Sequence, residues 1–383
     1  MTIGIGGAGS KLASMLDHGN CTVVNVSESE LNKVKATNRV LAVTHSTRGQ
    51  FKGAGRNPEV GKTAFVSVQD EISEAINGNL VLTSTGGGTG NGITSVLLDN
   101  VSAEEDISLL HRTMFGFVLP YIHREAPEHV DNTINFLKGP VSNAIDSGNT
   151  GNMILFSNRF KFEARISEEE CNRLMTSSLQ NFLDIPAKGD VFELLDGHID
   201  HEDFNVYKSK PYFNHFTQFF YDTDRSFEKQ LNENYNQLLL SPERTIEAMF
   251  LLEVPHADQA PMLYNILDYF AEDDVNPSYG VILNPELDKP TVTVSLLYSR
   301  KPKELVNDFG MQADKLNRKR LKKSLEQFVK LKSTPFDISS AVKELTRPIA
   351  PDSRPDAGRD HVDFKSSGES DVMSVLKRLK KLK

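Results

Sequence analysis

The chain has 383 residues, of which 38% are hydrophobic, with a mean hydropathy of −0.37 and a formal net charge of −9. This length allows two domains with well-filled cores, and we expect neither a membrane-spanning run nor a signal peptide. The acidic balance argues against general nucleic-acid binding by the body of the protein, and the two cysteines, Cys21 and Cys171, make no disulfide framework, which favours a reducing cytoplasm.

The N-terminal residues predict a short strand followed by a glycine turn into a helix. Gly4, Gly6 and Gly9 fit the G-x-G-x-x-G dinucleotide fingerprint, and Glu28 follows a second strand predicted over 22–26. Taken alone, this pattern would indicate a NAD-dependent dehydrogenase. Further phosphate-binding turns along the chain argue against that interpretation, because a dehydrogenase has no use for them.

A second glycine-rich loop, Gly-Ala-Gly-Arg-Asn-Pro-Glu-Val-Gly-Lys-Thr, occupies residues 53–63. It is nearly a Walker A loop, but its glycine spacing is one residue too long and no buried strand leads into it, so we reject that interpretation. The glycines let the backbone turn tightly and Arg56 can supply positive charge. Asn57 and the proline after it end the loop before a helix predicted over 60–76.

The chain is organised around residues 80–92, Leu-Val-Leu-Thr-Ser-Thr-Gly-Gly-Gly-Thr-Gly-Asn-Gly. The first five predict a buried strand, and the apolar residues from Ile93 onward recur at helical spacing, so the glycines lie at a strand-to-helix turn. Backbone N–H groups there can converge on an anion, and Thr89 and Asn91 can add hydroxyl and amide donors. The alternative, a flexible linker, is not normally bounded by a strand and an amphipathic helix.

These segments resemble, in order, the phosphate loops of the tubulin and FtsZ superfamily. The central one is similar to the G-G-G-T-G-[ST]-G signature, with Asn91 in the variable slot. Residues 53–61 resemble an FtsZ loop that senses the terminal phosphate. The resemblance continues to the strand predicted at 291–298, with specific motifs in the first 200 residues and only patterns afterwards.

The resemblance implies an α/β fold: a Rossmann-like GTPase domain with a parallel sheet, a central core helix, a second α+β domain with a mixed sheet, a C-terminal helix and a disordered tail. It implies GTP or GDP with Mg²⁺ as the bound ligands. The nucleotide-binding residues that it implies are Gly6, Gly7, Ala8, Gly9, Ser10, Asn25, Gly53, Ala54, Gly55, Arg56, Asn57, Gly86, Gly87, Gly88, Thr89, Gly90, Asn91, Gly92, Pro120, Glu125, Asn158 and Asn172.

Two further strands, predicted over 113–119 and 152–157, end near residues that the resemblance assigns to the sugar and the base. Pro120 falls where the family has a proline that contacts the sugar. The family also has a glutamate shortly after this proline; no glutamate aligns with it here, and Glu125 is the nearest candidate. Asn158 resembles the turn whose amide reads the guanine edge, and an amide can both donate and accept. A solvent-facing turn asparagine would look identical in the sequence.

A helix with an N-cap serine and an acidic first turn is predicted over 167–183. It resembles the core helix of the family, in which Asn172 takes the place of an asparagine that also contacts the guanine. The match then loosens at an apparent insertion around 185–190.

An acidic segment follows Gly197. The family has a G-x-x-N-x-D-x-x-D loop here that reaches into the nucleotide pocket of the next subunit. An ungapped alignment from Gly197 places Asp200, Glu202 and Asn205 at the N, D and D positions of this motif. Shifting the alignment by one residue places Asp203 at one of these positions. A carboxylate within one water of a γ-phosphate can orient that water for attack, so Asp200, Glu202 and Asp203 are the candidate catalytic residues.

The same segment contains His198 and His201, which with Asp200 and Asp203 suggest a rival zinc site. A zinc site needs at least a third protein ligand beyond the histidine pair, and no distant Cys/His cluster is evident. We therefore predict no protein metal site and expect these side chains in a polar, solvated loop.

The elements predicted after residue 211 describe an α+β domain with a mixed sheet. The strands are expected over 212–221, 245–254, 279–283 and 291–298, and the helices over 226–239 and 257–270. The expected domains are 1–165 for GTP binding, 166–196 for the core helix and connection, 197–302 for the second domain, 303–346 for a C-terminal helical extension and 347–383 for a flexible tail.

The C-terminal residues carry the features that differ from FtsZ. A long basic helix predicted over 303–332 resembles the tubulins of phages and large plasmids, such as TubZ or PhuZ, although such a helix could simply pack on its own second domain. Residues 347–371 are rich in Pro, Asp, Ser and Gly. Residues 372–383 form a basic amphipathic pattern that either only solvates the tail or binds, in order of preference, an adaptor protein, an anionic membrane or DNA.

The function implied by the resemblance is that of a cytoskeletal GTPase in a bacterial or infected-host cytoplasm. Such a protein polymerises head to tail with itself and hydrolyses GTP at the subunit interface, for DNA segregation or positioning in a phage or plasmid system. The alternatives are an FtsZ-like cell-division protein and a tubulin-like structural protein that binds nucleotide with little hydrolysis.

Overall fold

The computed structural model describes residues 1–43, 53–104 and 107–299, together with positions 302, 305, 309, 310, 314 and 318. The chain divides into two units, Met1–Lys322 and Lys323–Lys383, and the described residues belong to the first. The predicted flexible tail, and all but a few positions of the predicted helical extension, lie outside the described residues. The expected domain boundaries stay predictions.

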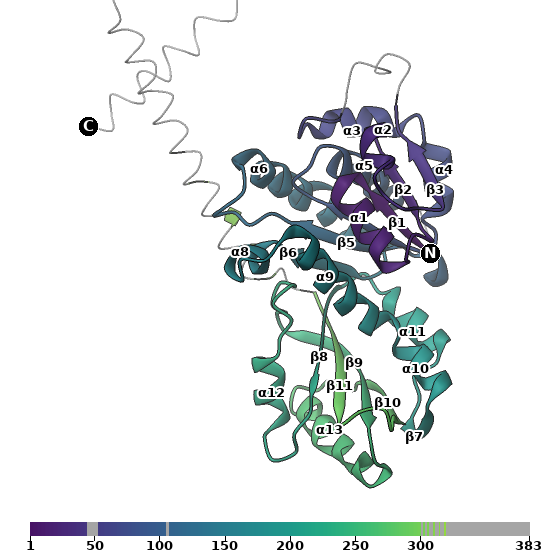
Figure 1. The fold of residues 1–383 in the computed structure, drawn as a ribbon, viewed down its shortest axis with the longest axis vertical. Helices are drawn as coiled ribbons and strands as arrows, with labels where there is room; N and C mark the ends of the chain where they lie inside the picture. The colour runs from purple at the N-terminus through teal and green to yellow at the C-terminus, as the bar shows by residue number, and fades with distance from the viewer. Residues whose placement is uncertain are drawn as a thin grey trace, which may run out of the picture. The chain divides into compact units, whose positions relative to one another are not determined.

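The strands of the described chain form one 11-stranded sheet in the order β3-β2-β1-β4-β5-β6-β8-β11-β9-β10-β7 (Figure 1). The first six are parallel: β1 Thr2–Ile5, β2 Thr22–Asn25, β3 Asn38–Leu41, β4 Leu80–Ser84, β5 Met114–Leu119 and β6 Met153–Ser157. The accompanying helices are α1 Gly6–Leu16, α2 Glu28–Leu31, α3 Pro58–Phe65, α4 Gln69–Ala75, α5 Thr89–Ala103, η1 Leu109–His111, α6 Pro127–Phe136, η2 Leu137–Val141, α7 Ser142–Ser147 and α8 Arg159–Glu163. Strands β1, β2 and β5 are buried along their whole length, as parallel strands between two helical layers should be.

The other five strands form the mixed part of the sheet. They are β7 Glu193–Gly197, β8 Phe213–Phe220, β9 Thr245–Val254, β10 Ser278–Leu283 and β11 Thr291–Tyr298, with helices α12 Phe227–Glu233, η3 Ala257–Met262 and α13 Leu263–Glu272. Strand β11 is antiparallel to β8 and β9, and β10 is parallel to β9. The parallel and mixed parts meet where β6 pairs with β8 at two positions. The predicted fold class is confirmed.

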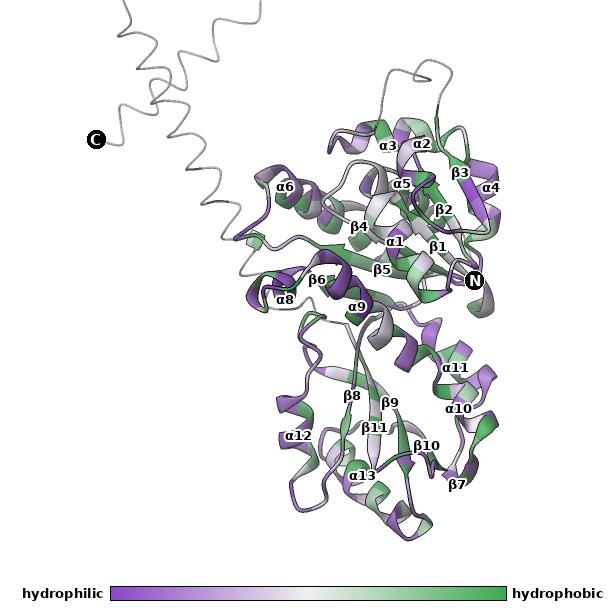
Figure 2. Cartoon of the chain, viewed as in Figure 1, coloured by the Kyte–Doolittle hydropathy of each residue, from purple (hydrophilic) through white to green (hydrophobic). Residues whose placement is uncertain are grey.

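Helix α9, Glu168–Leu183, lies between the two parts of the sheet (Figure 1). The Ser167 side chain caps it by accepting a hydrogen bond from the N–H of Glu170, as its N-cap position predicts. Its buried residues recur at helical spacing, and Phe182 stacks on Phe216 of β8 with ring centroids 5.0 Å apart. Purple, hydrophilic residues cover much of the rest of α9 in Figure 2, so a single apolar face joins the two parts.

Several predicted elements have different bounds. The helix expected over 226–239 ends at Glu233, because the segment after it pairs with β6: the N–H of Ser157 donates to the Leu238 carbonyl and the N–H of Leu240 to the Leu155 carbonyl. The helix expected over 60–76 is two helices, α3 and α4. The helix expected over 257–270 starts as the 3₁₀ segment η3, whose proline has no N–H to donate. The apparent insertion at 185–190 is α10, Ile185–Val191.

His215 is buried in β8, and both of its ring nitrogens are engaged. The Nδ1–H donates to the Leu240 carbonyl at 2.9 Å, and Nε2 accepts from the N–H of Asn236 at 3.2 Å. This arrangement fits only the neutral ring, and burial lowers the pKa of His215 to about 4. Because the unfolded chain protonates this group near pH 6.5, its contribution to stability is fully present above that pH.

We therefore expect about 3 kcal/mol of the free energy of unfolding to be lost as the pH falls from about 6.5 to about 4. The variant His215→Gln keeps a donor and an acceptor but does not titrate. Urea unfolding at a series of pH values should show that the free energy of unfolding of the variant falls less steeply than that of the wild type between about pH 6.5 and about pH 4. Parallel curves for the two proteins would rule out His215 as a source of acid sensitivity.

Candidate nucleotide-binding site

A cavity of about 230 Å³ lies at the carboxyl ends of the parallel strands, where open α/β sheets bind their ligands. Seven of its lining residues were predicted from the sequence: Ala8, Gly86, Gly87, Pro120, Glu125, Asn158 and Asn172. Six were not: Ser84, Val118, His129, Lys161, Glu168 and Cys171. A larger cavity of about 700 Å³ is lined by α6, η2, α7 and residues near 309, and it contains none of the glycine turns.

The first and central glycine turns touch each other. Helix α1 begins at Gly6, whose φ of +75° favours glycine. A Cβ on Gly6 would lie 2.9 Å from the backbone nitrogen of Gly90, and one on Gly9 would lie 2.0 Å from the Leu82 carbonyl oxygen. The sequence thus allows α1 to pack directly on β4, which brings residues 6–10 against 86–92.

The central turn ends at Gly88, the N-cap of α5, and no side chain caps this helix within the described part of the chain. The first N–H groups of a helix have no intrahelical partner, and the helix dipole makes this end positive. Asn91 differs from expectation, because its Nδ2 donates to the carbonyls of Thr85 at 2.5 Å and Asn132 at 3.1 Å. Its amide therefore holds the turn.

The loop at 53–57 packs against the same turn from outside the cavity. A Cβ on Gly88 would lie 2.7 Å from the Cβ of Ala54 and 2.8 Å from the nitrogen of Asn57. Asn57 caps α3 by accepting from the N–H of Glu59. The Arg56 guanidinium lies 3.9 Å from the Glu128 carboxylate, so its positive charge is partly compensated by α6.

Glu125 joins the residues at the other end of the cavity. Its Oε1 accepts from the Asn158 Nδ2 at 2.8 Å and the Tyr121 N–H at 3.0 Å, and its Oε2 is 3.3 Å from His129 Nδ1. A carboxylate only accepts, so the Asn158 amide must turn its nitrogen to Glu125 and leave its carbonyl oxygen for other donors. Glu125 thus orients Asn158 in this structure, and its expected place near the ribose stays a prediction.

The first turns of α9 close the cavity. Asn172 and Cys171 are buried there, and burial raises the pKa of the Cys171 thiol. Lys11 Nζ lies 2.6 Å from Glu168 Oε1, and this hydrogen bond lowers the pKa of the Glu168 carboxyl group. This side of the cavity is therefore lined by Lys161 and by Glu168, whose charge is paired with Lys11.

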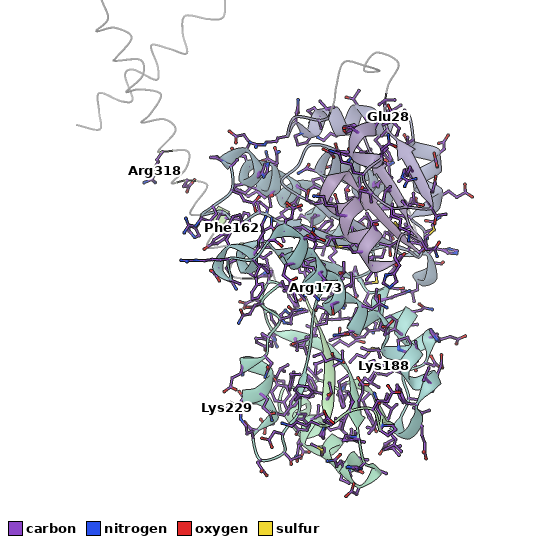
Figure 3. All side chains as sticks on the ribbon, viewed as in Figure 1. Glu28, Phe162, Arg173, Lys188, Lys229 and Arg318 are labelled. Carbon is purple, nitrogen blue, oxygen red and sulfur yellow. The ribbon has the colours of Figure 1, made fainter. Side chains whose placement is uncertain are left out.

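Asn25, one of the nucleotide-binding residues that the resemblance implies, is buried and does not line the cavity. Its amide donates to Glu30 Oε2 at 2.7 Å, and that oxygen is 3.0 Å from the Cβ position of Gly7. Glu28, the acidic residue of the dinucleotide pattern, is exposed at the start of α2, and Figure 3 places it on a different side of the parallel part from Phe162 of α8. The carboxylate beside the first turn is thus Glu30.

The candidate catalytic acids lie on a helix, so the expectation of a loop is wrong for most of this segment. Asp200 is the N-cap of α11, His201–Lys208, and its Oδ1 accepts from the N–H of Asp203 at 2.7 Å. Glu202 and Asp203 are exposed in the first turn. The segment is helical because an acidic N-cap and first turn precede the buried Phe204 and the residues after it.

Helix α11 sits at the amino ends of the parallel strands, opposite the cavity. The N–H of Asn152, just before β6, donates to the Lys208 carbonyl at 2.7 Å. Strand β6, five residues long, spans about 16 Å. Helix α9 spans about 24 Å between the cavity and α10, which packs on α11 (Figure 1). The acids of one subunit therefore lie remote from its own glycine turns.

The two histidines of the rival metal site lie against α10. His201 Nε2 is 2.9 Å from Asp190 Oδ2, and the His198 ring is 3.5 Å from the Cβ position of Gly189. In the three described ranges, no group of three or more His, Cys, Asp or Glu side chains is arranged to hold a metal ion.

Comparisons with known proteins agree with this geometry. Residues 1–147 match the Tubulin/FtsZ family, GTPase domain. "Cell division protein FtsZ 1" from Pyrococcus horikoshii is 34% identical over 105 residues, which is 25% of this chain and 28% of that protein. The sequence match to this curated relative thus spans well under half of its length.

Solved structures are similar over much more of the chain. A GTPγS-form protofilament of TubZ from Bacillus thuringiensis serovar israelensis has a TM-score of 0.68 at 15% identity, covering 84% of this chain and 93% of that one. A GTPγS-bound protofilament of CetZ2 from Haloferax volcanii has a TM-score of 0.63 at 19% identity, covering 83% and 98%.

The parallel sheet, the core helix, the mixed sheet and the glycine-lined cavity together define the tubulin/FtsZ fold. Residues 1–147 match the GTPase domain of the Tubulin/FtsZ family, and the described remainder completes the fold found in TubZ and CetZ2.

Proposed function

We propose that this protein binds GTP, polymerises head to tail into filaments and hydrolyses GTP where two subunits meet. One observation carries this proposal: the glycine-lined cavity and the acids of α11 lie at opposite edges of the same parallel sheet. A single subunit keeps them apart, whereas a head-to-tail neighbour brings the acids of one to the cavity of the next. TubZ and CetZ2, which share the fold, were both solved as protofilaments.

The phosphates would lie against the turns at 6–10 and 86–92, where backbone N–H groups of α1 and α5 are available. The oxygen donors near this end, such as Ser84 and Thr89, are the kind that Mg²⁺ accepts, so the residues fit a magnesium ion that arrives with GTP. Such an ion would supply charge neutralisation on the phosphates. Asp200, Glu202 or Asp203 from the neighbour would orient the attacking water.

The base would lie at the Asn158 end of the cavity. Guanine presents N–H donors on its Watson–Crick edge, and the Asn158 carbonyl oxygen, which Glu125 leaves available, can accept them. Adenine presents an acceptor at the same ring position, so the fixed amide would favour guanine.

The variant Glu125→Gln should weaken this preference, because a neutral amide allows Asn158 to turn either way. We expect the ratio of ATP to GTP dissociation constants to fall by about tenfold, as one misplaced buried hydrogen bond costs about 1 kcal/mol or somewhat more. Competition against a fluorescent GDP analogue measures both constants. The exposed residue Glu128, three positions further along the chain in α6, gives the control Glu128→Gln, which should leave the ratio unchanged. An unchanged ratio in Glu125→Gln would reject the orienting role.

The proposed function is tested by sedimentation with magnesium and GTP, GDP, ATP or no nucleotide, with phosphate release measured in the same tubes. We expect GTP alone to drive the protein into the pellet, with release rising steeply above a critical concentration. Binding of GTP without any pellet would reject the filament, and pelleting with no phosphate release would favour the alternative of a structural protein with little hydrolysis.

The cellular role that we propose is DNA segregation or positioning in a phage or plasmid system, in a bacterial or infected-host cytoplasm. It is supported by the structural likeness to TubZ over 84% of the chain and by the basic helix predicted at 303–332. The curated FtsZ relative supports cell division as the alternative role. No helix in the described ranges is long and apolar enough to span a membrane. We propose that the basic tail binds an adaptor, with membrane or DNA as less favoured partners.

A further inference from the structure

Asn132 of α6 connects two of the glycine-rich loops. Its Nδ2 donates to the Gly86 carbonyl at 3.0 Å and to the Arg56 carbonyl at 2.9 Å, which uses both amide hydrogens. Its own backbone carbonyl accepts from Asn91. One side chain on α6 therefore bridges the central turn and the loop at 53–57, and neither loop is adjacent to it in sequence.

Helix α6 is a firm support for this bridge. Thr133 Oγ1 is 2.8 Å from Thr85 Oγ1, which ties α6 to the residue before the central turn. Val130 and Phe136 are buried in the core of the parallel part. A second link between α6 and the loop at 53–57, the ion pair of Arg56 with Glu128, is exposed and contributes little.

The position of the loop suggests what the bridge controls. Ala8, Gly86 and Gly87 line the cavity, whereas the loop at 53–57 contacts Gly88 beyond them. A phosphate chain that extends from a base near Asn158 would pass the lining glycines first and reach this loop with its last phosphate. With the nucleotide bound in this way, the loop would face the phosphate that a triphosphate has and a diphosphate lacks.

We propose that Asn132 is a positioning residue that sets the spacing between the central glycine turn and the loop at 53–57, and thereby lets the site distinguish a nucleoside triphosphate from a diphosphate. The proposal rests on the proposed nucleotide binding. Asn132 acts through the two backbone carbonyls that it holds, and it need not contact the nucleotide.

The test compares the affinities for GTPγS and GDP, measured by competition against a fluorescent GDP analogue below the concentration at which the protein sediments. In Asn132→Ala we expect binding of GTPγS to weaken by about tenfold and binding of GDP to change by about twofold or less. Asn132→Ser keeps one donor and should fall between this variant and the wild type. Asn135→Ala, an exposed position on the same helix, is the matched control and should leave both affinities unchanged.

Equal losses for the two nucleotides would show that Asn132 only holds the fold together and would overturn the proposal, as would no loss at all. If Asn132→Ala does not fold, Asn132→Ser carries the comparison, because it keeps a polar hydroxyl donor at this position. A wild-type protein that binds neither nucleotide would reject the proposed function itself, and this result is visible before any variant is measured.

Discussion

Replacing the proposed catalytic acid at the start of α11 by its amide should lower GTP turnover at least about 100-fold while filaments still form. The variants are Asp200→Asn, Glu202→Gln and Asp203→Asn, each of which removes one carboxylate from the segment that faces away from its own cavity. Asparagine is as good an N-cap as aspartate, so Asp200→Asn keeps the cap of α11. Phosphate release and sedimentation measured together separate a loss of chemistry from a loss of assembly.

A mixing experiment tests whether the acids act on the neighbouring subunit. The complementary variant is Gly87→Asp, which places a carboxylate where phosphates would bind and whose nearest contact is the movable Ser84 hydroxyl at 3.2 Å. Each variant alone should be inactive. In an equimolar copolymer about a quarter of the interfaces combine an intact cavity with intact acids, so turnover should recover to roughly that fraction.

Recovery on mixing cannot arise if each subunit uses its own acids, because no subunit in the mixture carries both an intact cavity and intact acids. If none of the three amide variants loses turnover, the catalytic role of this segment is rejected. If one variant loses turnover but mixing restores nothing although the two copolymerise, the acid is needed within the same subunit and the shared site is rejected.

The parts of the fold that were predictable have strong local signals. Strands β9 and β11 have the predicted bounds, because their apolar runs are bounded by proline and polar residues. Strand β4 and the turn after it were predicted because a buried strand, five glycines and a helical period follow one another within 18 residues, 80–97. Such elements can be predicted from residues close together in the sequence, without knowledge of tertiary contacts.

The missed elements depend on contacts between distant segments. Strand β7 is mostly exposed and was not predicted, because its pairing with β10 alone makes it a strand. The helix predicted to continue to residue 239 stops early because Leu238 and Leu240 bond to β6, although their apolar pattern suits a helix equally well.

In the candidate site, too, some residues have a local sequence signal and others depend on tertiary contacts. Its glycines are recognisable as motifs, whereas His129 and Asn132 reach the glycine turns only because α6 packs there. The one available signal was local: Glu125 and His129 are four residues apart, a spacing at which side chains on one helical face can meet. No periodic pattern identifies a side chain that holds two distant carbonyls.

Gly92→Ala should destabilise the protein by about 3 kcal/mol or more, because it would force a methyl group into backbone. A Cβ at this position would lie 2.0 Å from the Pro58 carbonyl oxygen and 2.7 Å from the Lys62 nitrogen. Gly61 of α3 faces the same contact, with its own Cβ position 3.1 Å from the Cα of Gly92. Helices α3 and α5 thus approach each other glycine to glycine, and neither backbone can move away without separating the two helices.

The displacement of α3 from α5 in Gly92→Ala should also weaken nucleotide binding. Helix α3 begins at Pro58, directly after the loop that packs on Gly88, so a displaced α3 would carry that loop away from the central turn. We expect the urea midpoint of Gly92→Ala to fall and its affinity for GTPγS to fall with it. Gly139→Ala is the matched control, because nothing lies within 4 Å of its Cβ position. A Gly92→Ala protein as stable as this control would mean that α3 and α5 can yield at their contact, and the loop at 53–57 would then lack the rigid base on which the proposed discrimination between nucleotides depends.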